Sequence, residues 1–457
     1  MKRHSLIVLV LVLAGGLTTG AQVPAAPGGA ADVDQWAQWR GPLASGVAPR
    51  GQPPVQWSEQ QNVKWKVLIP GNGASTPIVW GDKVFLQAAI LTDQKDAVPQ
   101  VTDPKAPPPT TIPAGMAAMF APASQNVHEF VLMCLERGTG KVLWQRVAKA
   151  AVPHERHHRD HGYASYSPIT DGKHVVAYFG SRGVHCFDMD GKLLWQKDLG
   201  LMRTRNAFGE GGSPALHEGV LIINWDHEGT DFIAAMEVAS GRELWRTPRD
   251  EPTSWSTPLV VRHGQQTQVI VSATTRIRGY DLANGKALWE CGGMTANVIP
   301  SPVSADGMVY AVSGHRGNAA VAIRVGKEGD LTDSDAIVWS YRKHMPYVPS
   351  PLLYGQRLYA CESNKAVLTC LDTRTGKPLY AAQKLEALEG VYSSPVGAAG
   401  QVYLVGRNGA AVVLKDADTL QILATNTLDD QFTASPAIVG KELLLRGHKH
   451  LYCLEQR

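Results

Sequence analysis

A dipeptide of Ser or Thr followed by Pro recurs eight times along this chain at a nearly constant interval. The copies are Thr76-Pro77, Ser167-Pro168, Ser213-Pro214, Thr257-Pro258, Ser301-Pro302, Ser350-Pro351, Ser394-Pro395 and Ser435-Pro436. From the second copy on, successive prolines are 46, 44, 44, 49, 44 and 41 residues apart. Such a period is typical of one four-stranded propeller blade. The spacing therefore predicts an all-β fold, an eight-bladed β-propeller of four-stranded antiparallel blades.

Most repeats carry a second marker, in which an acidic residue is followed by a Gly turn and then by an aromatic residue. In the fourth repeat these residues are Asp281, Gly285 and Trp289. Such a turn closes a hairpin, because the acidic side chain accepts backbone N–H groups and Gly adopts a positive φ. We expect the Trp to begin the outer strand and to pack between neighbouring blades.

The last repeat has three predicted strands, at 436–439, 443–446 and 451–454, and no fourth strand follows them. An isolated strand pattern lies near the other end of the chain, at Val63–Val67. We expect this N-terminal strand to complete the C-terminal blade. Closing the ring in this way leaves only short, protected sheet edges.

The first residues predict export. Lys2 and Arg3 precede an apolar stretch and a small-residue cleavage region, which together form a signal peptide over residues 1–21. No Cys lies near the cleavage region, so we expect a periplasmic or secreted protein without a lipid anchor or a transmembrane segment. Residues 22–54, rich in Ala, Gly and Pro, predict a tether, and residues 55–457 the propeller, with an insertion at 88–126 in its first blade.

The charge and the cysteine positions argue against nucleic-acid partners and against disulfide bonds. The formal net charge is only +3 over 457 residues, without the basic excess that nucleic-acid binding requires. We expect a monomer. Four of the six cysteines occupy one repeat slot, each two residues before an acidic residue, which predicts small buried packing residues in place of disulfides: Cys134, Cys186, Cys370 and Cys453.

Propeller geometry places the loops that join strand d to strand a, and strand b to strand c, on one face. Their polar and aromatic residues are the candidate ligand face: Tyr163, Tyr166, Arg182, Asp226, His227, Trp255, Arg276, His315, Arg316, Asn318, Tyr347, Tyr392, Arg407 and His448. Together they suit an anionic or sugar-like ligand or an extended peptide. Ordinary solvated loop residues are the alternative interpretation. The insertion falls on the same face, as a lid, a partner site or a disordered flap.

The loop that enters the second blade is rich in histidine. It holds four His and two acidic residues within eight positions, and its histidines are His154, His157, His158 and His161. Imidazole and carboxylate groups are ligands of transition metals, so a metal-dependent hydrolase or lyase is one hypothesis. The spacing matches no known ligand pattern, and a solvated polar loop is the other hypothesis.

The combined Ser/Thr-Pro, Asp-x-x-Thr-Gly-Lys and Trp pattern resembles the pyrroloquinoline-quinone (PQQ)-type repeat over nearly all of residues 55–457. That superfamily includes quinoprotein alcohol dehydrogenases and the propeller lipoprotein of the outer-membrane protein assembly machine. The chain is most similar to exported PQQ-binding-like β-propeller repeat proteins of bacteria. Its stretch Trp39-Arg40-Gly41-Pro42 resembles the lead-in of that group.

The resemblance implies two functional hypotheses. Quinoprotein dehydrogenases hold PQQ with calcium, an adjacent Cys-Cys disulfide and a catalytic Asp. This chain has no adjacent Cys pair, and Asp226 and Asp231 are its acidic candidates. We therefore expect a non-catalytic scaffold without a cofactor that binds a cell-envelope protein or a polysaccharide. The alternative is a PQQ-dependent oxidoreductase acting on a small alcohol or sugar.

Overall fold

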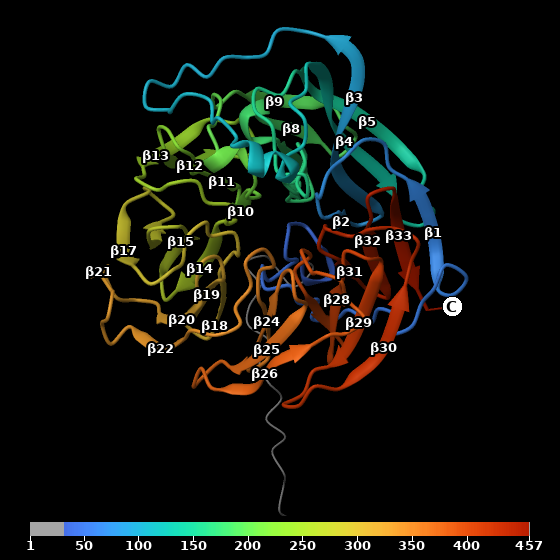
Figure 1. The fold of residues 1–457 in the computed structure, drawn as a ribbon, viewed down its shortest axis with the longest axis vertical. Helices are drawn as coiled ribbons and strands as arrows, with labels where there is room; N and C mark the ends of the chain where they lie inside the picture. The colour runs from blue at the N-terminus through green and yellow to red at the C-terminus, as the bar shows by residue number, and fades with distance from the viewer. Residues whose placement is uncertain (1–31, 457) are drawn as a thin grey trace, which may run out of the picture.

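The computed structural model of the chain describes residues 32–456, so the predicted signal peptide lies outside the described residues. Within this range the strands form eight sheets, arranged as blades around a central axis (Figure 1). Seven sheets have four strands and one has five. The predicted eight-bladed β-propeller is confirmed.

Each blade is an antiparallel meander that begins close to a Ser/Thr-Pro dipeptide. Blade 1 contains β2 (Ile78–Trp80), β3 (Lys83–Lys95), β4 (Asn126–Glu136) and β5 (Val142–Ala151). Blade 2 contains β6 (Ile169–Thr170), β7 (His174–Tyr178), β8 (Val184–Asp188) and β9 (Leu193–Lys197). Blade 3 contains β10 (Ala215–His217), β11 (Val220–Trp225), β12 (Phe232–Glu237) and β13 (Glu243–Pro248).

Blades 4 and 5 are linked by an extra strand. Blade 4 contains β14 (Leu259–His263), β15 (Gln266–Ser272), β16 (Ile277–Asp281) and β17 (Ala287–Cys291). Blade 5 contains β18 (Val303–Ala305), β19 (Met308–Ser313), β20 (Ala319–Arg324) and β22 (Ile337–Tyr341). The connection between β20 and β22 is long, and its short strand β21 (Gly329–Asp330) pairs in parallel with β17.

The last three blades complete the ring. Blade 6 contains β23 (Leu352–Tyr354), β24 (Arg357–Glu362), β25 (Val367–Asp372) and β26 (Pro378–Lys384). Blade 7 contains β27 (Val396–Ala398), β28 (Gln401–Val405), β29 (Ala410–Lys415) and β30 (Ile422–Thr427). Blade 8 contains β31 (Ala437–Val439), β32 (Glu442–Arg446), β33 (His450–Glu455) and, as its outer strand, β1 (Val63–Leu68).

Strand β1, from the N-terminal part of the chain, pairs with the last strand of the C-terminal blade. It pairs antiparallel with β33, so that Trp65 lies opposite Cys453 and Val67 opposite Leu451. A strand from the N-terminal side thus supplies the fourth strand of the C-terminal blade. Because this pairing brings residues nearly 400 positions apart into one sheet, the last blade is complete only when both ends of the chain are in place.

The Ser/Thr-Pro dipeptides form a ring of hydrogen bonds around the axis. The backbone N–H of each Ser or Thr donates to the side-chain hydroxyl of the equivalent residue in the next blade. Seven such bonds, of 2.8–3.0 Å, run from Thr76 through to Ser435. The ring is open between Ser435 and Thr76, where the buried Thr76 hydroxyl has no protein partner.

In five blades the Trp of the outer strand docks onto the Gly turn of the neighbouring blade, whereas Trp289 of blade 4 donates its indole N–H to Gln268 of its own blade. Trp339, at the start of the outer strand of blade 5, donates its indole N–H to the carbonyl of Thr373 in blade 6, at 2.7 Å. A Cβ on Gly376, whose φ is +68°, would lie 2.5 Å from that indole ring. Equivalent indole bonds come from Trp65, Trp144, Trp195 and Trp245. The Gly is therefore required both for the turn and for the close approach of the Trp.

Residues 32–54, predicted as part of a tether, pack against the propeller. Trp36 is fully buried and pairs with Val79 through two backbone hydrogen bonds. The Arg40 guanidinium donates to the carbonyls of Pro351 and Pro395, at 2.8 and 2.7 Å, which immediately precede the first strands of blades 6 and 7. This segment therefore lies under the centre of the ring, and the contacts of Trp36 and Arg40 hold it there.

Two further features concern covalent bonds and membranes. All six cysteines are free and buried, as the repeat slots predict. The structure also has short 3-10 helices, η1 (Asp32–Asp34), η2 (Ala114–Met119), η3 (Gly180–Arg182) and η4 (Arg205–Ala207). None of the helices in residues 32–456 has the length and hydropathy that a membrane crossing requires.

The hydroxyl ring predicts the effect of removing one link. Ser301→Ala leaves the part-buried N–H of Thr257 without its acceptor, so we expect a loss of about 0.5–1.5 kcal/mol in the free energy of unfolding, measured by urea denaturation. Ser304→Ala is the matched control, because Ser304 lies in β18 outside the ring. Equal stability of the two variants would show that the ring bonds contribute nothing.

Candidate functional site

A cavity of about 430 Å³ lies on the propeller axis, where the blades begin. Hydroxyl groups of the Ser/Thr ring line it: Thr76, Ser213, Thr257, Ser394 and Ser435. Its aromatic walls come from the loops between blades and from the N-terminal segment: Trp39, Phe208, Trp255, Tyr347 and Tyr392. Cavities of this size hold small molecules or the end of a larger ligand.

The single acidic residue of the lining is Asp160, and it is already paired. Arg407 donates to one carboxylate oxygen at 2.7 Å, and the Tyr392 hydroxyl lies 3.3 Å from the other. The Arg407 guanidinium also lies over the Tyr392 ring, 4.4 Å from its centroid. This contact joins the His-rich loop to blades 6 and 7 across the axis, and it leaves no free carboxylate in the cavity lining.

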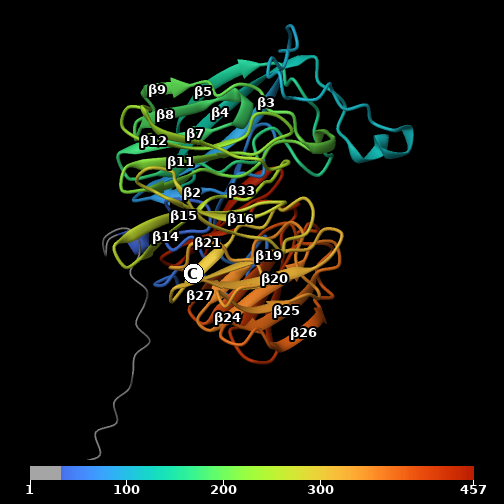
Figure 2. The same cartoon turned by 90° about the vertical axis from the view of Figure 1, so that its left-hand side faces the viewer.

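The insertion of blade 1 is ordered and covers part of the same face. Figure 2 shows it projecting from one face of the ring. Phe120 stacks on Phe208 with ring centroids 5.7 Å apart, and Met119 lines the cavity. Further along the insertion, Asp103 accepts hydrogen bonds from the N–H and hydroxyl of Thr230 at 2.6 and 2.9 Å. The insertion is thus fastened to blade 3 at one point and to the His-rich loop at another.

The four histidines of residues 154–161 do not converge on one point. His154 contacts the Met202 carbonyl through Nε2 and Arg182 through Nδ1, at 2.6 and 3.0 Å. His161 contacts the Glu210 carbonyl at 2.8 Å, and burial lowers its pKa to about 4. In residues 32–456, no group of three His, Cys, Asp or Glu side chains is placed to hold a metal ion. The arrangement gives the metal hypothesis no support.

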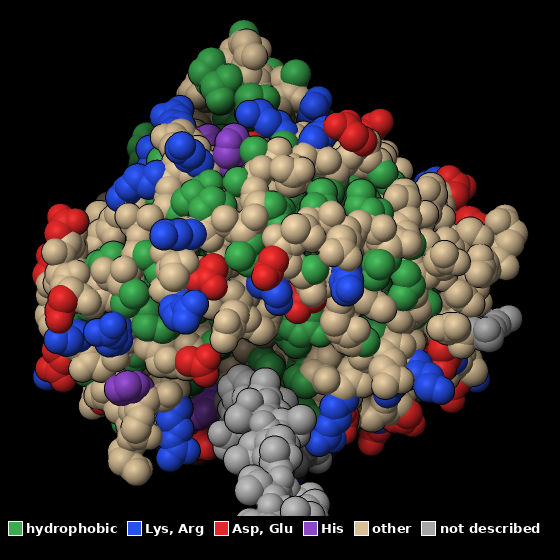
Figure 3. All heavy atoms as spheres, turned by 90° about the horizontal axis from the view of Figure 1, so that it is seen from below, with side chains coloured by type: hydrophobic (Ala, Val, Ile, Leu, Met, Phe, Trp, Pro, Cys, Tyr) green, Lys and Arg blue, Asp and Glu red, His purple; other side chains and the backbone are tan. Residues whose placement is uncertain are grey.

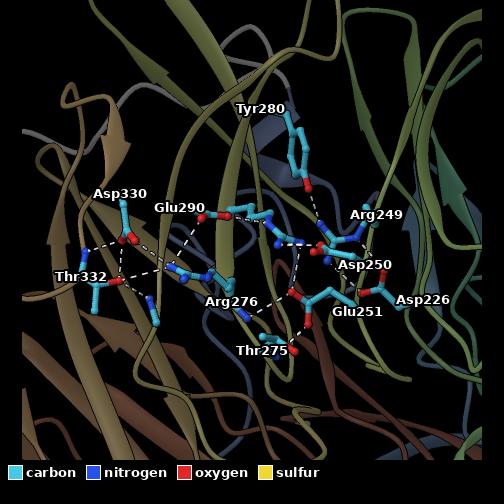
Figure 4. A network of polar contacts seen from close by, with 12 residues as sticks. Asp226, Arg249, Asp250, Glu251, Thr275, Arg276, Tyr280, Glu290, Asp330 and Thr332 are labelled. Carbon is cyan, nitrogen blue, oxygen red and sulfur yellow. Dashed lines mark hydrogen bonds and ion pairs between the residues drawn. The ribbon is translucent and has the colours of Figure 1, made fainter.

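Three residues of the candidate ligand face lie in polar networks outside the cavity lining. Figure 4 shows Asp226 next to Arg249, whose Nε donates to the carboxylate at 2.6 Å, and both side chains are fully buried. Arg276 in the same view reaches Asp330 at 3.1 Å. His227, buried behind the insertion, lies 3.8 Å from Asp103. These groups stabilise blades 3–5 and are not available to a ligand.

The candidate residues thus divide into two sets. Six of them line the cavity: His158, His161, Trp255, His315, Tyr347 and Tyr392. The others lie outside its lining: His154, His157, Tyr163, Tyr166, Arg182, Asp226, His227, Arg276, Arg316, Asn318, Arg407 and His448. Arg407 still acts on the cavity through Asp160. Aromatic residues in the loops thus predicted the cavity lining better than cationic residues did. The reason is that cationic side chains such as Arg276 form ion pairs with carboxylates of neighbouring blades.

Sequence reasoning missed two aromatic residues of the lining. Trp39 belongs to the segment interpreted as a tether, and its motif Trp39-Arg40-Gly41-Pro42 was recognised as a lead-in but not as part of a ligand face. Phe208 lies just after η4, in a loop without a repeat signature. Of the two, only Trp39 could have been predicted from the sequence, because an aromatic residue in an Ala/Gly/Pro-rich segment is expected to pack against a folded domain.

The sequence of the chain matches a known protein family. The sequence profile of the family described as outer membrane protein assembly factor BamB matches residues 128–327 and 230–457. The chain belongs to this family. No curated protein sequence matches the chain significantly.

Solved structures show the same fold at low sequence identity. BamB from Moraxella catarrhalis is similar to this chain with a TM-score of 0.51 and 14% identity, over 80% of this chain and 98% of that one. A quinohemoprotein alcohol dehydrogenase, ADHIIG from Pseudomonas putida, gives a TM-score of 0.55 and 10% identity, over 93% and 81% of the two chains. The fold is therefore shared by proteins of different function, and fold alone does not decide between them.

The aromatic contact predicts how the insertion is held. Phe120→Ala removes the stacking on Phe208, so we expect faster hydrogen exchange in residues 96–125 and unchanged exchange in the strands. Val98→Ala is the control, because Val98 lies in the same insertion and is 39% exposed. Unchanged exchange in the Phe120 variant would show that the contact does not fasten the insertion.

Glu155 of the His-rich loop predicts a dependence of stability on pH. Burial raises the pKa of Glu155 to about 7, from 4.5, so the folded chain keeps a proton that the unfolded chain releases. The free energy of unfolding therefore falls as the pH rises from about 4.5 to 7. Glu155→Gln lacks this fall, and we expect it to gain on the order of 3 kcal/mol relative to the wild type between pH 4.5 and 8.

Urea denaturation of both proteins across this pH range measures the difference, to which the buried histidines contribute equally in both. Glu386→Gln, at an exposed position, is the control and should follow the wild type. Parallel curves for the wild type and the Glu155 variant would contradict the raised pKa.

Proposed function

We propose that this protein is a non-catalytic binding propeller that holds a segment of a protein or polymer ligand in its axial cavity. The observation that carries the proposal is the cavity lining, which combines aromatic walls with a floor of hydroxyl groups. Aromatic faces supply contact area at low entropic cost, and hydroxyl groups orient a ligand through hydrogen bonds. Such a lining recognises shape and polar pattern, and its one carboxylate, Asp160, is already paired.

The state of the acidic residues supports a binding function over catalysis. A carboxylate acts as a general base only when it is free and within reach of the ligand. Asp160 is held by Arg407 and Tyr392. His161 uses both ring nitrogens, on Ser165 and on the Glu210 carbonyl. Asp231 accepts hydrogen bonds from two backbone N–H groups away from the cavity lining.

The lining is a poor fit for the quinone that the superfamily implies. PQQ is a planar polycarboxylate, and its charges require cations around the ring edge. The lining of the cavity contains neither Lys nor Arg. The two cysteines nearest in sequence, Cys361 and Cys370, are both free. We therefore propose that the cavity takes no PQQ and that calcium has no role in it.

The place of action follows from the family and from the sequence. The family is named for an outer membrane protein assembly factor, and residues 1–21 predict export. We propose that the protein works outside the cytoplasm, on a protein or polymer of the cell envelope. On the side of the ring that Figure 3 displays, Lys and Arg side chains alternate with Asp and Glu, without a large patch of one charge. Such a surface does not favour nucleic acid.

Two titrations of residues 22–457 test this proposal. In calorimetry with PQQ, with and without calcium, we expect no saturable binding, and one-to-one binding at micromolar concentration would overturn the proposal. In a second titration, oligosaccharides and peptides from the cell envelope are added while tryptophan fluorescence is recorded. A binding member of that panel should lose at least about tenfold in affinity with Trp255→Ala, whereas Trp80→Ala, a half-buried residue outside the cavity, should leave the affinity unchanged.

A further inference from the structure

The floor of the axial cavity has unused hydrogen-bond donors. Ser213, Thr257, Ser394 and Ser435 each accept one backbone N–H within the hydroxyl ring. Their own O–H groups donate to no protein atom in residues 32–456, and the buried Thr76 hydroxyl has no protein partner at all. Four hydroxyl groups of the lining, those of Ser213, Thr257, Ser394 and Ser435, therefore keep an O–H that a group in the cavity can accept.

Two buried arginines lie directly beside this ring. Arg40 is 3% exposed and donates to the carbonyls of Pro351 and Pro395, the residues that follow Ser350 and Ser394 in the ring. Arg446 is 2% exposed and donates to the carbonyls of Gln87 and Ser75, the second of which precedes Thr76. Both side chains thus hold backbone carbonyls next to residues of the hydroxyl ring, and of those ring residues Ser394 and Thr76 line the cavity.

Neither arginine has an anionic partner. All of their hydrogen bonds within residues 32–456 go to neutral carbonyl groups, and the Nε of each is buried without a partner. Burial lowers the pKa of Arg40 to about 9 and that of Arg446 to about 10, and no neighbouring charge contributes to either shift. Both therefore remain charged at neutral pH. A buried cation without a counter-charge is costly, so a bound anion would stabilise the folded state.

The rest of the cavity does not cancel this positive field. Its one carboxylate, Asp160, is paired with Arg407, and burial keeps the His161 imidazole neutral at pH 7. The Trp39 ring, 5.9 Å from the Arg40 guanidinium carbon, offers only a weak cation–π contact. Donors and positive potential therefore coincide at the floor of the cavity, on the side where Thr76 and Ser435 leave the hydroxyl ring open.

We propose that the floor of the axial cavity is a binding site for one small monovalent anion, a halide ion or a carboxylate group, held by the hydroxyl groups of Ser394 and Ser435 in the field of Arg40 and Arg446. This site goes beyond the proposed ligand binding, because a free ion occupies it without any polymer. A carboxylate at the end of a polymer ligand would place its charge at the same point.

Chloride NMR tests the site on residues 22–457. We expect the ³⁵Cl line width to show a saturable excess on titration with sodium chloride, and its absence would overturn the proposal. Addition of sodium acetate then separates the two sources of the anion. Loss of the excess means that carboxylate groups also enter the site, and persistence of the excess means that it takes halide ions only. Both outcomes support an anion site.

Variants locate the site. Ser435→Ala should weaken chloride binding about tenfold, since it removes a hydrogen bond to a charged group. Ser301→Ala removes an equivalent ring hydroxyl that lies outside the cavity lining, and it should leave chloride binding unchanged. Equal affinities of these two variants would overturn the assignment. Arg446→Met should weaken binding further, and if it fails to fold, the Ser435 and Ser301 pair still decides.

A crystal soaked in sodium bromide gives the position directly. The expected anomalous peak lies in the axial cavity within hydrogen-bond distance of the Ser394 and Ser435 hydroxyl groups. A peak elsewhere, with none on the axis, would overturn the proposal. Failure of the polymer titrations would leave this result standing, because the bromide soak and the chloride titration use no polymer.

Discussion

The hydrogen bond from each Ser or Thr backbone N–H to the hydroxyl of the next blade is the interaction on which this fold depends. It links seven of the eight blade junctions at the innermost strand, where the blades crowd together. The Pro that follows has no N–H, so it leaves no further donor unpaired at this point. The hydroxyl accepts one bond and keeps its own proton, and the repeat that closes the ring therefore also lines the cavity with donors.

The asymmetry of the site arises at the one junction where the ring is open. There the chain brings its two ends together, with β1 completing the blade of β33. Arg446 spans the gap by reaching the carbonyls of Ser75 and Gln87, while Arg40 supports blades 6 and 7 from below. Arg446 thus takes the place of the contact that is missing at the open junction, whereas Arg40 lies beside an intact link of the ring. Part of the charge near the cavity is therefore a consequence of how the ring is closed.

The sequence was sufficient for the fold because its signals are local and repeated. Ser/Thr-Pro, the Gly turn and the outer-strand Trp each act within one blade or on its neighbour, and the structure confirms them at Trp339 and Gly376. The site was predicted only in part. Loop aromatics such as Trp255 line the cavity, but Asp226 and Arg276 find partners in other loops that no spacing reveals. Trp39 was missed because its composition-biased neighbours resemble a linker.

The distinction between a small anion and a polycarboxylate cofactor follows from where the cations lie. Arg40 and Arg446 are outside the cavity lining and bind backbone carbonyls, so they act on a ligand only through their field. A field from below the floor stabilises one charge placed there, in a medium of low dielectric constant. It does little for charges around the edge of a flat ring, where direct ion pairs would be needed and where Asp160 stands on the wall. Because one fold can carry different functions, the position of the cations relative to the cavity is what separates the two ligand classes in this chain.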